Sequence, residues 1–234
     1  PEWADFTPYK LVVAPMLYML QPGVAERLEN FVAGGGTLVA TYWSGIVDEN
    51  DLAFLGGWPG GGLRKVFGIW DEETDTLTAS ERNSVVMSSG NALGLSGSYE
   101  ARDYLALIHA ETAQVLATYG SDFYAGRPAL TVNRFGKGQA YYMASRNDSK
   151  FLADFYGKLA ADLALLRALP AELPQGVTAQ LRTDGEKKFI FVMNFNAAPV
   201  SLQLNGETYE NMLSGEKVSG KLDLPAYGVE VLKA

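Results

Sequence analysis

The chain has 234 residues, of which 47% are hydrophobic and 20% charged, a balance typical of one large globular domain or two modest ones. Its formal net charge of −8 argues against a nucleic-acid partner, because phosphate binding requires clustered lysine and arginine. The absence of cysteine excludes disulfides, thiolate metal sites and cysteine nucleophiles, and the single histidine, His109, excludes a metal site built from several histidines. We therefore expect neither a metal ion nor a cofactor.

No apolar run approaches the roughly 18 residues that span a membrane, and the N-terminus lacks the basic and apolar regions of a signal peptide. We therefore predict a soluble, cytoplasmic chain with no membrane partner. The first residue is Pro1 and not methionine, which leads us to expect that upstream sequence has been removed.

The first elements predict a βαβ unit. Residues 10–15 form a short apolar run that ends in proline, the pattern of a parallel strand buried on both faces. Residues 22–33 predict an amphipathic helix that ends at a glycine triplet, and residues 37–42 predict a second buried strand. Such a unit is nearly always right-handed and belongs to an α/β sheet.

The middle of the chain is less regular. Residues 56–62 are a glycine-rich loop, and residues 63–70 fit either a short helix or a strand. A second amphipathic helix begins at Ser149 and continues to Pro170. Between them, extended segments are expected at residues 83–88, 104–110, 114–119, 129–133 and 139–144, the last two joined as a hairpin through Gly136 and Lys137.

The proline-rich segment 170–176 is the best domain boundary. After it come short strands separated by turn signals, of which Asp184-Gly185 and Asn205-Gly206 predict hairpins. We therefore expect an α/β domain over residues 1–170, with a mostly parallel sheet and flanking helices, and a small antiparallel β-sandwich over residues 177–234.

Two acidic clusters are candidates for glycoside hydrolysis, which uses a pair of carboxylates at a defined separation. Asp48, Glu49 and Asp51 form the densest cluster, and a second lies at residues 71–75. Carboxylates that are close in sequence usually point in different directions and solvate a surface. The structural interpretation is therefore favoured for both clusters.

A hydrolase with a serine nucleophile is a weaker alternative. His109 lies in an apolar segment that predicts a strand, and no Gly-x-Ser-x-Gly turn is present to activate a serine. Ser44 precedes a glycine but lacks the rest of that pattern. We interpret His109 as a structural residue.

Tyr42 and Trp43 follow the second predicted strand and precede the acidic cluster Asp48, Glu49 and Asp51. Aromatic rings at a strand end can cover the core, anchor a protein interface or stack on a sugar. The adjoining acidic and glycine-rich segments favour an interface slightly over core packing, and direct sugar contact is the weakest of the three. These five residues are the candidate interface or substrate-proximal site.

Several segments resemble the family 42 glycoside hydrolases, the bacterial β-galactosidases. The segments that carry the resemblance are Tyr9-Lys-Leu-Val-Val-Ala-Pro-Met-Leu-Tyr-Met-Leu20, Pro22-Gly-Val-Ala-Glu-Arg-Leu28, Gly35-Gly-Thr-Leu-Val39, Thr41-Tyr-Trp-Ser-Gly-Ile-Val-Asp-Glu-Asn-Asp51 and Gly68-Ile-Trp70. They cover the family's middle, trimerisation domain over residues 1–169, and the tail resembles its small C-terminal β domain.

The resemblance implies a flavodoxin-like or glutamine amidotransferase-like fold for the first domain, starting inside that domain. It also implies that the family's catalytic glutamates belong to an N-terminal barrel of the same parent chain, which this sequence does not contain. The expected function is therefore non-catalytic assembly of a homotrimeric, retaining β-galactosidase that hydrolyses terminal β-D-galactosides. Two alternatives remain: an independent amidotransferase-like or esterase-like hydrolase using Ser44 or His109, and a carbohydrate-binding module using Tyr209 or Tyr227.

Overall fold

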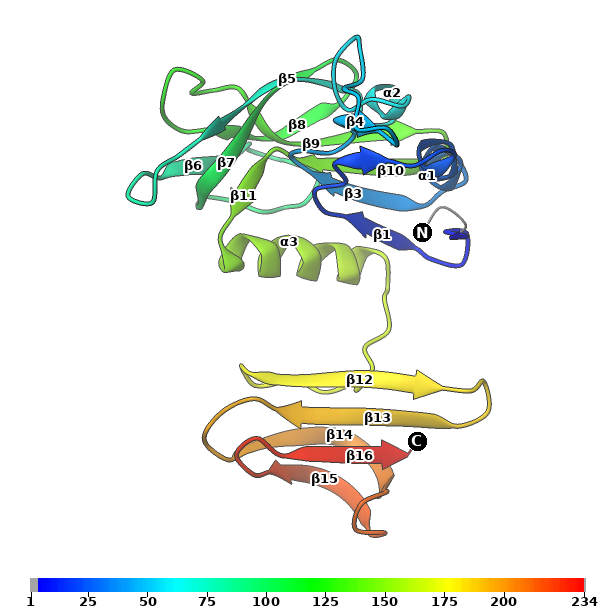
Figure 1. Cartoon of the computed structure of the whole chain (residues 1–234). Helices are drawn as coiled ribbons and strands as arrows, with labels where there is room; N and C mark the ends of the chain where they lie inside the picture. The colour runs from blue at the N-terminus through cyan, green and yellow to red at the C-terminus, as the bar shows by residue number, and fades with distance from the viewer. Residues whose placement is uncertain (1–3, 234) are drawn as a thin grey trace. The chain divides into compact units, whose positions relative to one another are not determined.

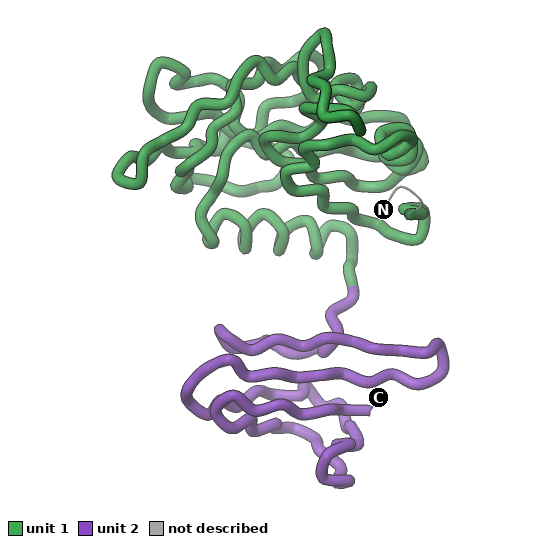
Figure 2. Tube along the Cα trace, in the orientation of Figure 1, with its two compact units in different colours: residues 1–165 green, residues 166–234 purple. Residues whose placement is uncertain are grey.

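The computed structural model describes residues 4–233 and divides into two compact units, Pro1–Leu165 and Leu166–Ala234 (Figure 2). We call them unit 1 and unit 2. No helix in the described part of the chain is long and apolar enough to cross a membrane.

Unit 1 is built around a nine-stranded mixed sheet (Figure 1). The strand order is β1-β3-β10-β9-β8-β6-β7-β11, and β5 pairs with β7. The bounds are β1 Leu11–Ala14, β3 Thr37–Thr41, β5 Ile69–Thr76, β6 Asn83–Met87, β7 Ser98–Ala110, β8 Gln114–Tyr119, β9 Pro128–Phe135, β10 Gly138–Met143 and β11 Ser145–Asn147. A separate parallel pair joins β2 (Met19–Leu20) to β4 (Val47–Asp48).

The prediction of a mostly parallel sheet is wrong. Within this sheet only β1–β3 and β3–β10 are parallel, and the other pairs are antiparallel. A parallel pair needs a long crossover, whereas the strands from β6 to β10 follow one another through loops and turns with no helix between them, as at Gly136-Lys137. The predicted βαβ unit and this hairpin are both confirmed.

The first strand is also less buried than predicted. β1 is the last strand in the sheet order, so only one of its edges is paired. Its Val13 side chain is 41% exposed, while every residue of β3 is buried. Burial on both faces is therefore correct for β3 and wrong for β1.

The three helices pack on the two faces of the sheet. α1 (Val24–Ala33) corresponds to the first predicted helix. α3 (Ser149–Asp162) begins where the second was predicted, but it ends at Asp162 and does not continue to Pro170. Residues 63–70 contain both a helix, α2 (Leu63–Phe67), and the start of β5. Successive strand residues face opposite sides. In β10, Tyr142 therefore meets Phe67 of α2 and Tyr141 meets Phe155 of α3, each with ring centroids 5.5 Å apart.

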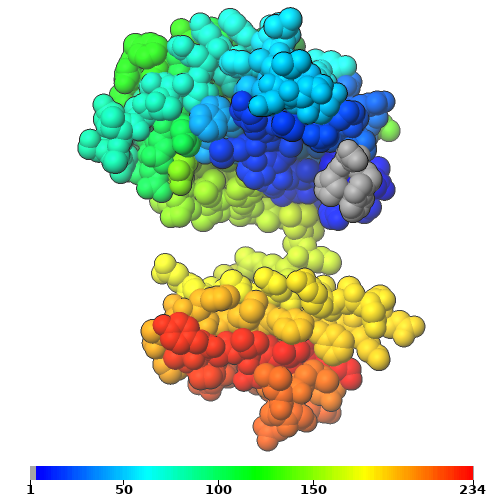
Figure 3. Space-filling model, in the orientation of Figure 1, coloured from blue at the N-terminus to red at the C-terminus, as the bar shows by residue number. Residues whose placement is uncertain are grey.

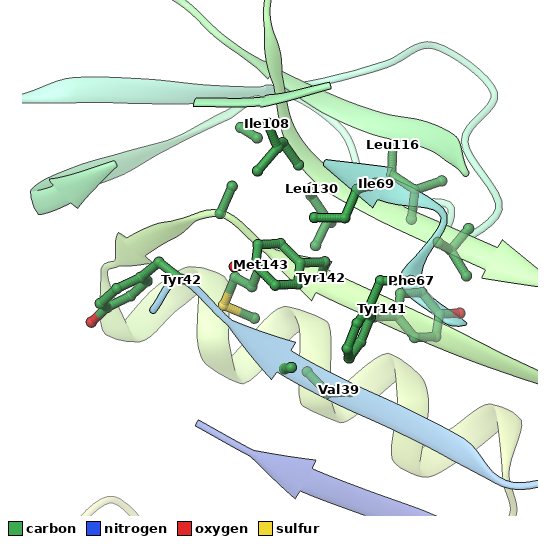
Figure 4. Close-up of a cluster of buried hydrophobic side chains, with 14 of the residues drawn as sticks. Val39, Tyr42, Phe67, Ile69, Ile108, Leu116, Leu130, Tyr141, Tyr142 and Met143 are labelled. Atoms are coloured by element: carbon green, nitrogen blue, oxygen red, sulfur yellow. The ribbon is translucent and has the colours of Figure 1, made fainter. Parts of the chain in front are cut away.

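The core of unit 1 lies between the sheet and these helices. Figure 4 shows Tyr142 among aliphatic side chains from β5, β7 and β9, while Tyr42 and Met143 lie at the end of β3 and β10. The fully buried residues include large aromatic rings, so this unit buries a substantial apolar area.

Unit 2 is a single five-stranded antiparallel sheet with the order β12-β13-β16-β14-β15. Its bounds are β12 Val177–Thr183, β13 Lys188–Asn194, β14 Val200–Asn211, β15 Lys217–Leu224 and β16 Val229–Lys233. The antiparallel prediction is confirmed, but hydrogen bonds join all five strands, so the two separate sheets of a sandwich are not formed. The β14–β15 hairpin meets β16 through only two residue pairs, and apolar residues of both parts share one buried cluster.

The turn at Asp184-Gly185 is confirmed between β12 and β13, but the predicted hairpin at Asn205-Gly206 is wrong. Those two residues lie inside β14, where the pairing with β15 shifts register. Both halves of β14 pair with the same strand, so the chain bulges there and does not reverse. The Asn205 side chain donates to the carbonyl oxygen of Pro170 at 2.7 Å, which fixes the bulge.

Candidate functional site

The parallel strands β1, β3 and β10 end at the same edge of the sheet, and a groove of about 530 Å³ lies there. We call it the strand-end groove. Crevices at the carboxyl ends of parallel strands are common binding positions. Val13, Met16, Tyr42, Met143 and Leu152 supply much of its apolar wall.

The turn after β3 is held by its own polar side chains. The Thr41 hydroxyl accepts a hydrogen bond from Met16 N at 2.8 Å, which ties β1 to β3. Ser44 Oγ donates to the Thr41 carbonyl at 2.7 Å and accepts from Leu17 N at 3.2 Å. Ser44 is fully buried and its hydroxyl serves the backbone, so it is not available as a nucleophile.

Tyr42 and Trp43 have different environments. Tyr42 is only 7% exposed, and its burial raises the pKa of the phenol. Trp43 is half-buried, has a positive φ of 58°, and its ring centroid lies 4.4 Å from that of Tyr104. Tyr42 therefore packs mainly within this chain, whereas Trp43 is held by Tyr104 in a backbone conformation that bulky residues rarely adopt.

The acidic residues that follow, Asp48, Glu49 and Asp51, also differ in their environments. The Asp48 carboxylate accepts backbone hydrogen bonds from Asn50 N at 2.9 Å and Leu52 N at 3.0 Å, so it shapes the turn. Glu49 and Asp51 are exposed, and among the described residues neither forms an ion pair. The five predicted residues lie in one segment after β3. Tyr42 is buried, Trp43 and Asp48 are partly buried, and Glu49 and Asp51 are exposed.

Backbone contacts connect this segment to both neighbouring loops. Gly45 N donates to the Leu17 carbonyl at 2.7 Å, and Gly60 N donates to the Gly45 carbonyl at 2.7 Å. Gly45 has a φ of 64°, and a Cβ there would lie 2.9 Å from Gly60 N, so only glycine fits this close approach.

Two arginines missed in the sequence lie at the strand-end groove. Arg102 on β7 and Arg146 on β11 are directly opposite each other in the antiparallel register, and both line the groove. They are 44 positions apart and belong to no motif, so only the strand pairing brings them together.

A second hollow, of about 450 Å³, lies beside β5 and the loop before α2. Trp70 stacks on His109 with ring centroids 4.7 Å apart, and His109 Nε2 lies 2.8 Å from Glu72 Oε2. Arg127 donates to the same oxygen at 3.0 Å. The hydrogen bonds from His109 and then Arg127 lower the pKa of Glu72. His109 is thus a partly exposed structural residue that is hydrogen-bonded to the Glu72 carboxylate.

Trp70 is partly covered by its own chain at this hollow. His109 stacks on its ring, and Gly57 lies so close that a Cβ would be 2.5 Å from the indole. The Arg64 guanidinium lies 5.9 Å from the ring centroid. The rest of the half-buried ring lines the hollow.

In the second acidic cluster Glu72 and Glu73 are exposed, as predicted for a solvated surface, but Asp71 is not. β5 carries the cluster, and Asp71 is only 2% exposed, with Tyr142 Oη donating to Asp71 Oδ2 at 3.1 Å. Burial raises the pKa of Asp71 to about 7. Tyr124 donates to Asp75 at 2.9 Å. Within the described residues, no group of three or more His, Cys, Asp or Glu side chains could hold a metal ion.

Comparison with protein families decides the identity. Residues 1–166 match the family model of the β-galactosidase trimerisation domain, and residues 176–234 match that of the β-galactosidase C-terminal domain. The chain belongs to the family 42 glycoside hydrolases. The resemblance seen in the sequence is thereby confirmed.

Relatives in this family are much longer than the chain. The β-galactosidase Pbg of Clostridium perfringens is 55% identical over 229 residues, which cover 98% of this chain and 33% of Pbg. BglY of Alicyclobacillus acidocaldarius is 50% identical over 225 residues, covering 96% of this chain and 33% of BglY. The chain therefore spans about a third of the length of these family members.

Solved structures in the family have the same fold. A β-galactosidase from Rahnella sp. R3 superposes with a TM-score of 0.92 at 54% identity, over 99% of this chain and 33% of that one. The β-galactosidase from Bacillus circulans sp. alkalophilus gives 0.91 at 44% identity, over 99% and 34%. The region that matches is the trimerisation and C-terminal part of such enzymes, and neither the independent hydrolase nor the carbohydrate-binding module is supported. Tyr209 is moreover buried, so it offers no stacking platform.

Proposed function

We propose that the chain is the non-catalytic assembly region of a β-galactosidase and that it joins three copies of the parent enzyme. The observation that carries the proposal is the match of residues 1–166 to the trimerisation-domain family model. An exposed apolar groove, also lined by Arg102 and Arg146, at the carboxyl ends of β1, β3 and β10 is the kind of surface that such a role requires.

The parent chain in this proposal carries an N-terminal catalytic barrel that hydrolyses terminal β-D-galactosides with retention. Two facts support it: the relatives are named β-galactosidases, and the chain spans about a third of their length. The 234-residue chain should then show no hydrolysis of an aryl β-D-galactoside. Turnover by the purified chain would contradict a purely assembling role.

Trp43 is the proposed anchor of the subunit interface, with Tyr42, Asp48, Glu49 and Asp51 as its surroundings. A strained αL backbone at a half-buried tryptophan is unusual, and such outliers are often retained for a function. Tryptophan is also enriched among residues that dominate binding energy.

The test is the mass in solution of the wild type and Trp43→Ala, measured by light scattering. We expect a trimer for the wild type and a smaller species for the variant at the same concentration. Trp70→Ala is the matched control, since Trp70 is also a partly exposed, stacked tryptophan but lies at the hollow beside β5. A monomeric wild type, or an unchanged trimer of Trp43→Ala, would contradict the anchor.

We also propose that the β1-α1-β3 part with β10 is the remnant of a flavodoxin-like or amidotransferase-like sheet. The parallel order β1-β3-β10 and helices on both faces support it. The cytoplasmic location stays a prediction.

A further inference from the structure

The strand-end groove combines apolar surface with unbalanced positive charge. Val13, Met16 and Leu152 line it and are between 37% and 43% exposed. Arg102 and Arg146 stand at the same groove. A pocket of about 530 Å³ with this lining is large enough to receive side chains of a partner.

The two arginines are unfavourably placed for a chain that stands alone. They are directly opposite in the antiparallel register, and like charges in that position are destabilising. A single carboxylate lies between them: Asp103 Oδ2 is 3.0 Å from Arg146 NH1 and 3.9 Å from Arg102 Nε. Within residues 4–233, Asp103 is the ion-pair partner of both arginines and no other carboxylate pairs with either, so two positive charges share one counter-charge in a protein whose formal net charge is −8.

The loop after β4 has the complementary properties. Leu55 is 98% exposed and Leu52 is 63% exposed, so the loop presents apolar side chains to solvent. Glu49 and Asp51 are exposed beside them and take part in no ion pair within residues 4–233. Asp48 fixes the turn through its two backbone hydrogen bonds, so less conformational entropy is lost when the loop is bound.

The loop is joined through β4 and β2 to the chain segment that leaves β1 at the groove. In Figure 3 the blue N-terminal strand region and the light-blue loop region are exposed next to each other. β2, which follows β1, is hydrogen-bonded to β4, which precedes the loop. A heterologous contact between two different patches of identical subunits closes into a ring when the rotation allows it, as a cyclic trimer requires.

On the basis of the proposed trimerisation, we propose that the loop carrying Glu49, Asp51 and Leu55 on one copy binds the strand-end groove at Arg102 and Arg146 on the next. The carboxylates supply the missing counter-charge, and the leucine enters the apolar part of the groove. Charge complementarity selects a second copy of this chain as the occupant. If another part of the parent chain occupied the groove, assembly would not depend on the loop, and loop variants would leave it unchanged.

A charge-reversal cycle tests the pairing. The groove variant is Arg102→Glu with Arg146→Glu, the loop variant is Glu49→Lys with Asp51→Lys, and the third protein combines all four changes. Each reversal alone places like charges together and should raise the concentration for half-assembly by about a hundredfold, while the combined variant recovers the trimer. Light scattering over a dilution series measures the assembly, and circular dichroism checks the fold.

A second pair of variants does not disturb the fold. Leu55→Glu replaces a side chain that is already exposed, and Leu166→Glu makes the same change at another leucine that is also 98% exposed. We expect about tenfold weaker assembly for Leu55→Glu and no change for Leu166→Glu. This pair decides the question if a charge-reversed variant fails to fold.

The outcomes separate the two proposals. If the wild type is a trimer and neither Leu55→Glu nor the reversals weaken it, the loop-to-groove contact is overturned while trimerisation stands. Failure of the folded combined variant to recover the trimer also overturns the contact. If the wild type is monomeric at the highest concentration, both the proposed assembly function and the proposed contact are overturned.

Discussion

The strand-end groove and the hollow beside β5 both carry aromatic rings beside charged groups, but the charges are balanced differently. At the hollow, Glu72 accepts from both His109 and Arg127, and Trp70 stacks on His109. At the groove, two arginines share one aspartate. The proposed contact with a second copy would supply the counter-charge at the groove, whereas the hollow needs none.

The comparison predicts that changes at or next to the hollow beside β5 alter stability without altering assembly. Each of the following variants should therefore be measured twice: the free energy of unfolding by denaturant titration, and the mass by light scattering. A variant from this region that dissociates the trimer while folded would break the distinction.

The largest effect is expected for Asp71→Asn. The folded-state pKa of Asp71 is raised from 3.8 to about 7 by burial, so the folded protein holds this proton more tightly than the unfolded one. The stability from Asp71 is then fully present below its unfolded pKa and is lost as pH rises through about 7. Asp71→Asn should remove this pH dependence and be the more stable protein at alkaline pH, by a margin on the order of a few kcal/mol.

Glu73→Gln is the control for that experiment, because it removes a carboxylate from an exposed position of the same strand. It should leave the pH dependence of unfolding as in the wild type. A wild-type stability that rises between mildly acidic and neutral pH in step with Asp71 ionisation would contradict the burial argument.

An intermediate effect is expected for Gly68→Ala, at the junction of α2 and β5. Gly68 has a φ of 62°, and a Cβ would lie 2.4 Å from Thr112 Oγ1 and 2.7 Å from Asn133 Cγ. The variant should lose roughly 2–3 kcal/mol from steric clash added to backbone strain. Gly90→Ala, with a φ of 66° and open space around it, should lose only about 1 kcal/mol. Equal losses would show that the clash contributes nothing.

The smallest effect is expected for Glu72→Gln. The pKa of Glu72 is lowered by its hydrogen bonds to His109 and Arg127, so its contribution to stability is present above the ordinary value of 4.5 and is lost as pH falls through the lowered pKa. The variant should unfold slightly more easily than the wild type at neutral pH, with no difference in acid, because the pair is exposed. Thermal melts of both proteins at neutral and acid pH check this. A stability difference seen only at acid pH would contradict the prediction.

Local patterns predicted the elements better than the sheet. The apolar runs at β1 and β3, the amphipathic helix between them, and the Gly136-Lys137 turn each depend on a few neighbouring residues. The same local reasoning failed at Asn205-Gly206, because a turn signal does not reveal that the strands on both sides pair with one partner. It also failed to anticipate that most strand pairs in the sheet of unit 1 are antiparallel, since the order of strands is set by packing between distant segments.

For the candidate site, the sequence located the segment but not the environment of each side chain. Tyr42, Trp43, Asp48, Glu49 and Asp51 are neighbours in sequence, and their position after a buried strand located them at the sheet edge. Whether each one faces the protein or the solvent depended on Tyr104, Met143 and backbone amides supplied by the fold.

The sequence by itself determined the family, the βαβ start and the antiparallel tail, because motifs, hydrophobic period and turn residues are local properties. Only the tertiary structure decided that Asp71 is buried and that Arg102 and Arg146 are opposed. Burial and charge balance depend on which distant segments meet. That is why the surface proposed for assembly became recognisable only after the strands were placed side by side.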